Sequence, residues 1–185
     1  MRSVLDRLYG VSGWLAAACL AVIALMVGAQ LVGRIADSLM RFAGVRPYGF
    51  IVEGLAELAG YLLAASSLLA LASALKAGAH IRVTMLLGAL GGRARRAFEL
   101  GAVGASLAFA AYMAWRMALL MVDSWRFNEV SYGLVPLPLA YPQAAMFAGL
   151  LIFAIALVDE LVVVITRGRP SFAAAEETAI LGKEG

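Results

Sequence analysis

Four long apolar stretches, separated by short connections, constrain this chain more than any other feature. They cover about residues 11–33, 50–75, 98–122 and 142–165, and the first carries no charged residue. A helix needs roughly 20 mostly apolar residues to cross a bilayer core. Backbone N–H and C=O groups inside lipid must be satisfied within the protein, and a helix meets that need. The sequence therefore predicts an all-α membrane protein with four transmembrane helices.

The rest of the chain completes the predicted domain organisation. Residues 1–169 form the transmembrane domain, and residues 170–185, which are rich in Ala and Glu, form a mobile cytoplasmic tail. Short interfacial amphipathic helices are predicted at residues 35–42 and 81–90. The uncharged run at residues 8–33 exceeds the roughly 7–15 residues of a signal-peptide core, so we expect it to be retained as a span.

Composition excludes several classes of function. The chain is 63% hydrophobic, well above the roughly 45–50% of soluble domains, and its connections are too short for a soluble catalytic domain. Cys19 is the only cysteine and His80 the only histidine, which excludes an intramolecular disulfide, a bis-His haem and a multi-His metal site. Neither a Ser/His/Asp set nor a P-loop is present. We therefore expect no enzymatic activity and no cofactor.

The distribution of basic residues predicts the orientation. Ten flank one side of the predicted spans, and four flank the other. Positive charge is retained on the cytoplasmic side, so both termini are predicted to be cytoplasmic. Because these residues flank spans instead of forming one patch, nucleic acid is not an expected partner. The ten are Arg2, Arg7, Lys76, Arg82, Arg93, Arg95, Arg96, Arg167, Arg169 and Lys183, and the four are Arg34, Arg41, Arg46 and Arg126.

Charged residues inside the predicted spans are informative, because charge is costly there. Glu53 and Glu57 are one helical turn apart in the second span, and Arg116 lies in the third. At about 1.5 Å per residue, Glu57 and Arg116 both lie about 10 Å below the outer surface. An ion pair between them, with Glu53 as the alternative partner, would relieve the desolvation of both. A contact with a partner subunit and a proton- or ion-coupling carboxylate are the alternative interpretations.

Other polar residues near the spans have simpler interpretations. Asp159 and Glu160 lie at the inner end of the fourth span and are predicted to be solvated there or to pair with Lys76. The middle of each span is nearly free of polar side chains, whereas a single-chain transporter usually has midplane polar groups and broken helices. Small residues recur in the first three spans, for example at residues 16–18 and 64–67, and predict close helix contacts.

The connection after the second span ends in a cluster of arginines. We expect it to lie on the cytoplasmic face of the membrane, with its arginines either on lipid phosphates or at a docking site for another membrane subunit. The two roles are compatible. The cluster consists of Arg93, Arg95 and Arg96.

Three segments resemble the small membrane subunit of tripartite ATP-independent periplasmic (TRAP) transporters, the DctQ-like family. Residues 57–63, Glu-Leu-Ala-Gly-Tyr-Leu-Leu, resemble that family's Glu-Leu-Ala-x-Tyr entry to the second span. Residues 78–83, Gly-Ala-His-Ile-Arg-Val, resemble its Gly-x-His-Ile-Arg-Val signature, and residues 137–143 resemble its Pro-rich entry to the fourth span. The resemblance extends over about residues 14–165.

The resemblance implies a scaffold in the bacterial inner membrane that does not itself carry substrate. Its implied partners are a large DctM-like membrane subunit and a periplasmic binding protein, and the implied process is sodium-coupled uptake of an organic acid. On this interpretation His80 and Arg82 fix the interfacial helix after the second span, while Glu57 and Arg116 hold the second and third spans together. Candidate contacts for the binding protein are Arg46, Tyr48, Trp125, Arg126 and Glu129.

Two other functions remain open from the residues alone. A self-sufficient four-helix exporter is expected to have a carboxylate within the membrane in its first span, and residues 8–33 contain none. A non-catalytic subunit of another membrane complex would share the same small-residue faces and the same lack of midplane chemistry.

Overall fold

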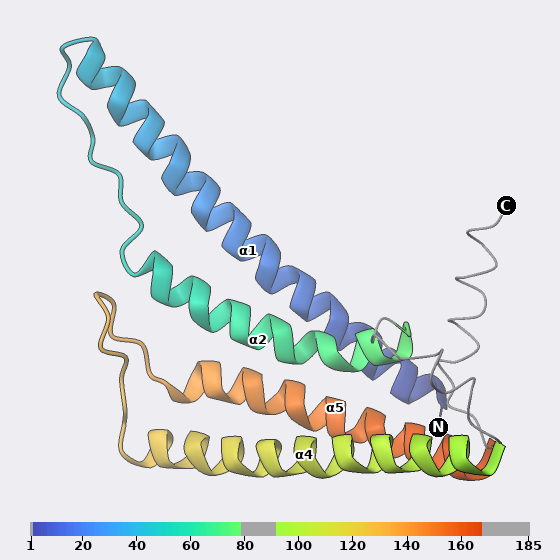
Figure 1. The fold of residues 1–185 in the computed structure, drawn as a ribbon. Helices are drawn as coiled ribbons and strands as arrows, with labels where there is room; N and C mark the ends of the chain where they lie inside the picture. The colour runs from blue at the N-terminus through green and yellow to red at the C-terminus, as the bar shows by residue number, and fades with distance from the viewer. Residues whose placement is uncertain (1, 79–91, 168–185) are drawn as a thin grey trace, which may run out of the picture.

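The computed structural model describes residues 2–78 and 92–167, and within these residues every named element is a helix (Figure 1). Each of the four helices is long and apolar enough to cross a membrane. The predicted all-α class with four spans is thereby confirmed. The helices are α1 (Arg2–Phe42), α2 (Leu55–Lys76), α4 (Gly92–Arg126) and α5 (Ala140–Arg167).

The helices pack in the spatial order α1, α2, α5, α4, which differs from their order in the chain (Figure 1). α2 packs against α1 and α5, and α4 packs against α5. The α2–α5 contact is close because Gly149 lies against the α2 backbone, where an added Cβ would come within 2.7 Å of Leu68 C and Leu69 N. The result is an open row with α1 and α4 at its edges, and each edge helix leaves a broad face uncovered by the other described helices.

The row has two distinct ends. The terminal end holds the start of α1, the end of α2, the start of α4 and the end of α5 (Figure 1). The loop end holds the connections at residues 43–54 and 127–139. α1 diverges from α2 toward the loop end (Figure 1).

α1 is one continuous helix, so residues 35–42 do not form the separate interfacial helix predicted from the sequence. The segment from Gly33 to Phe42 contains no proline, and a single glycine costs a helix only about 1 kcal/mol. Gly44, with φ 72°, follows the end of the helix. At about 1.5 Å per residue α1 is about 60 Å long, twice the roughly 30 Å of a bilayer core. It must therefore tilt or project from the membrane.

Short polar contacts join α1 to α2. The Ser12 hydroxyl donates a hydrogen bond to the Leu69 carbonyl, and the Ser66 hydroxyl donates to the Ala16 carbonyl at 2.9 Å. Ala16 and Ala65 are buried beside these contacts. Of the small residues predicted to mediate helix contact in the first two spans, Ala16, Ala65 and Ser66 are therefore at a helix interface, whereas Ala17, Ala18 and Ser67 are exposed.

α2 begins at Leu55 instead of near residue 50. Gly54 adopts φ 67° immediately before it, a conformation that favours glycine and that starts the helix there. Glu53 consequently lies outside the helix and is exposed, whereas Glu57 lies in the first turn. The expectation that the two carboxylates share one helix face is wrong.

Several sequence predictions concern residues that the structure does not describe. They are the interfacial helix at residues 81–90, the roles of His80 and Arg82, and the tail at residues 170–185.

Candidate functional site

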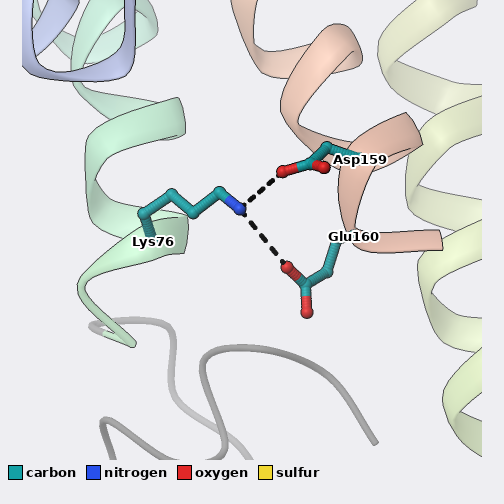
Figure 2. A network of polar contacts seen from close by, with 3 residues as sticks. All are labelled: Lys76, Asp159 and Glu160. Carbon is teal, nitrogen blue, oxygen red and sulfur yellow. Dashed lines mark hydrogen bonds and ion pairs between the residues drawn. The ribbon is translucent and has the colours of Figure 1, made fainter. Parts of the chain in front are cut away.

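A cluster of charged residues at the terminal end joins α2 to α5 (Figure 2). Lys76, the last residue of α2, places its Nζ 2.7 Å from Asp159 Oδ2 and 3.9 Å from Glu160 Oε2, both on α5. The same ammonium lies 5.4 Å from the ring centroid of Tyr9 in α1. The predicted pairing of these acids with Lys76 is confirmed. We call Tyr9, Lys76, Asp159 and Glu160 the Lys76 cluster.

The Lys76 cluster has the features of a structural joint. Glu160 is fully buried and Tyr9 is 2% exposed, whereas the side chains of Lys76 and Asp159 retain about a fifth of their accessibility. Lys76 can pass its apolar stem along the helix surface while its ammonium bridges the carboxylates. Its place in the last turn also suits the negative end of the α2 dipole.

A second set of contacts at the terminal end joins α4 to α5. Arg96 Nη2 donates to the Ile165 carbonyl at 2.6 Å, which satisfies one of the carbonyls that a helix end leaves without an intrahelical partner. Arg95 Nε donates to Glu99 Oε1 at 3.2 Å, and Glu99 is almost completely buried. Two of the clustered arginines thus make contacts within the chain, and Arg93 is exposed. Their predicted contacts with lipid phosphates or another subunit stay predictions.

At the loop end, Glu57 connects α2 to the α4–α5 connection. The Tyr61 hydroxyl donates to Glu57 Oε1 at 3.0 Å. Gly133 packs directly on the other carboxylate oxygen, Glu57 Oε2, and leaves no space for an added Cβ. Beside it, Val135 Cγ2 would lie 3.3 Å from a Cβ added at Gly54.

The α4–α5 connection is held by its own hydrogen bonds. The backbone N–H of Ser131 donates to the Leu137 carbonyl at 2.8 Å, and that of Leu139 donates to the Glu129 carbonyl at 3.0 Å. The Ser124 hydroxyl donates to Glu129 Oε2 at 2.6 Å. The prolines at 136 and 138 prevent a continuous helix here.

The structure does not bring the predicted pair of Glu57 and Arg116 together. Glu57 lies in the first turn of α2, not several residues inside the helix as expected. α5 lies between α2 and α4 in the row, and Arg116 is exposed on α4. Within residues 2–78 and 92–167, Arg116 forms neither a hydrogen bond nor an ion pair.

The candidate contacts for a binding protein are all exposed at the loop end. Arg46 and Tyr48 belong to the α1–α2 connection, and Tyr48 is 87% exposed. Trp125 and Arg126 end α4, and Glu129 follows in the next connection. A groove of about 400 Å³ lies between the end of α4 and the start of α5, and Arg126 is the one charged residue of its lining. Contact with a binding protein stays a prediction.

The described serine hydroxyls near the middle of α2 are not available to bind a polar solute, because they are already hydrogen-bonded. The Ser66 hydroxyl is bonded to the α1 backbone, and the Ser67 hydroxyl donates to the Leu63 carbonyl at 2.8 Å. Across the described ranges no group of three or more His, Cys, Asp and Glu side chains is arranged to hold a metal ion.

Comparison with family models identifies the chain. The model described as "Tripartite ATP-independent periplasmic transporters, DctQ component" matches residues 35–167. The chain belongs to the DctQ family. A DctQ protein is the small membrane subunit of a TRAP transporter and a multi-pass component of the inner membrane, in agreement with the four helices. Comparisons with curated proteins and with solved structures give no match.

Sequence reasoning missed several polar contacts in this DctQ protein, and three of them show why. Glu99 stands four residues after Arg95, a spacing that predicts a pair on one helix face. Asp37 is buried and accepts a hydrogen bond from the Gly49 N–H at 3.1 Å, which folds the first connection back on α1. The bond from Arg96 to a carbonyl of α5 leaves no signal in the sequence, because it depends on which helices are neighbours.

Proposed function

We propose that this DctQ protein is a fixed scaffold for the large DctM-like subunit. In this role the complex takes up an organic acid with sodium, and a periplasmic binding protein delivers the acid. The chain itself carries no substrate. It extends the part of the complex that stays anchored in the membrane while the large subunit moves.

The observation that carries this proposal is the placement of the polar contacts. They gather at the two ends of the row, as the Lys76 cluster and as the contacts of Glu57. The described serines near the middle of α2 bond to helix backbone instead of facing a shared cavity. A substrate pathway needs polar groups that converge at the midplane, usually beside broken helices. A row with its polar contacts at both ends is suited to support and not to conduction.

The open row also supports a role within a larger assembly. α1 and α4 form its edges, and each exposes many large apolar side chains. In a membrane such faces are covered by lipid or by other helices, and close packing drives helix association there. A closed four-helix bundle, as a self-sufficient exporter would require, would instead turn these faces toward a common interior.

The bias of basic residues supports a cytoplasmic terminal end. The loop end then faces the periplasm, where the binding protein arrives. Arg46, Tyr48, Trp125, Arg126 and Glu129 are exposed there and are the proposed contacts. Arg93, which is exposed at the opposite end, would meet the phosphates of the inner leaflet.

Uptake in cells tests the proposal. A strain that lacks this chain should lose sodium-dependent uptake of the organic acid, and the wild-type chain should restore it only when the large subunit and binding protein are also present. The large subunit should co-purify with the tagged chain. Uptake restored by this chain in a strain without the large subunit would contradict the scaffold role and favour the exporter.

A further inference from the structure

Arg116 is the one charged side chain in the middle of α4 and has no partner among the described residues. It lies ten residues before Arg126, which at about 1.5 Å per residue places it about 15 Å from the loop end of the helix. It is exposed on the side of α4 that α5 does not cover. In the membrane, a charge at this depth on a lipid-facing surface is costly and marks a functional contact.

The direction of the Arg116 side chain makes it difficult for the guanidinium to reach the nearer membrane surface. Every Cα–Cβ bond of an α-helix tilts toward the helix N-terminus, and long side chains follow that direction. The N-terminus of α4 is at the terminal end, so the side chain of Arg116 leads away from the closer loop end (Figure 1). Snorkelling works best for residues near helix ends, and Arg116 is far from both ends of α4.

The face around Arg116 has the composition of an interface. Tyr112 precedes it by one helical turn, and Leu120 follows by one turn. Tyr112 and Trp115 are 54% and 59% exposed, and their rings pack edge to face with centroids 6.2 Å apart. Arg, Trp and Tyr are the residue types most enriched among the interface residues that contribute most of the binding free energy. We call Phe109, Tyr112, Trp115, Arg116 and Leu120 the Arg116 face.

The charge of Arg116 defines its partner. A guanidinium at this depth is surrounded by acyl chains, and lipid phosphates lie at the membrane surfaces. A carboxylate neutralises the guanidinium and accepts two parallel hydrogen bonds from its planar fork. A neutral acceptor would leave the charge uncompensated in a medium of low dielectric constant.

We propose that the Arg116 face docks a transmembrane helix of the large subunit that presents an Asp or Glu side chain to Arg116. This inference rests on the proposed scaffold role, and it assigns the contact to the α4 edge of the row. The aromatic residues supply the packing surface, and the ion pair fixes the depth and rotation of the docked helix.

Co-purification of the intact complex tests the inference. The tagged chain is expressed with the large subunit, extracted in mild detergent and captured as wild type, Arg116→Leu or Arg41→Leu. We expect Arg116→Leu to reduce the captured large subunit about tenfold or more, as loss of one member of a desolvated pair does. Arg41→Leu, which removes an exposed arginine from the last turn of α1, should retain it.

The amount of this chain in the membrane distinguishes docking from folding. Because Arg116 forms no hydrogen bond or ion pair with the described residues, its replacement by Leu should leave that amount unchanged. A photoreactive side chain at Tyr112 should then crosslink to a large-subunit helix that contains Asp or Glu. Arg116→Glu should lose the large subunit, and Arg replacing that acid should restore it.

Each negative result has a distinct meaning. If wild type captures no large subunit, the scaffold proposal fails. If wild type captures it and Arg116→Leu retains it, only the docking inference fails. Crosslinks from Tyr112 exclusively to lipid, or to a second copy of this chain, would also overturn the docking inference.

Discussion

Removing the ammonium of the Lys76 cluster is predicted to destabilise the chain strongly. Lys76→Met keeps most of the side-chain length and removes the charge that lies 2.7 Å from Asp159 and 3.9 Å from Glu160. An exposed ion pair contributes about 0–1 kcal/mol, whereas breaking a buried pair costs about 3–5 kcal/mol. With Lys76 and Asp159 side chains 22% and 17% exposed, we expect a loss between these limits, about 2–3 kcal/mol.

Thermal unfolding of the purified protein in detergent measures this loss. For a chain of this size 1 kcal/mol corresponds to about 2–4 °C, so Lys76→Met should lower the Tm by about 4–12 °C. Arg7→Met removes an exposed positive charge from α1 and is the control, with little expected change. Adding Asp159→Asn to Lys76→Met should recover about half of the loss, because the two residues are coupled.

The Tm values of these variants can also refute the assigned role of the Lys76 cluster. If Lys76→Met unfolds at the wild-type temperature, or if Arg7→Met lowers the Tm equally, the Lys76 cluster is not a joint between α2 and α5. Failure of Asp159→Asn to recover any stability would show that the loss arises elsewhere.

Three further predictions follow from other contacts. Gly149→Ala should lower the Tm by several degrees through a loss of about 1–3 kcal/mol, because its Cβ would meet the α2 backbone at 2.7 Å. Tyr61→Phe removes the hydroxyl that donates to Glu57 and should cost about 1 kcal/mol, also measured by thermal unfolding. In a background without the native cysteine, a cysteine at Tyr48 should react in intact spheroplasts with a membrane-impermeant maleimide, and one at Arg7 should react only after lysis.

Each of these predictions has an opposing result. Wild-type stability of Gly149→Ala would show that the two helices do not approach so closely. An unchanged Tm for Tyr61→Phe would show that the hydrogen bond from Tyr61 to Glu57 does not contribute to stability. Labelling of the cysteine at residue 7 in intact spheroplasts would reverse the proposed orientation.

The fold class was predictable because hydropathy records directly which segments lie in lipid. Each apolar stretch corresponds to one helix, and the prolines of the third connection mark the break between α4 and α5. Hydropathy does not record where a helix continues beyond the membrane core. α1 therefore runs through residues 35–42, where the sequence predicted a separate interfacial helix.

The polar contacts were predictable where they depend on depth or on spacing within one helix. Lys76 and the acids of α5 were expected at the same membrane end and are found in contact there. The pairing of Glu57 with Arg116 assumed that consecutive spans are neighbours. The structure places α5 next to α2, because Gly149 allows their backbones to approach, and this adjacency has no signature in hydropathy.

The most direct test of the central claim is sodium-driven transport by the chain alone. Purified full-length protein is placed in liposomes with an inward sodium gradient, and entry of labelled carboxylates is followed with and without the large subunit and binding protein. We predict no flux above protein-free liposomes for the chain alone, and flux when all three components are present. Sodium-dependent carboxylate entry catalysed by this chain without its partners would contradict the account.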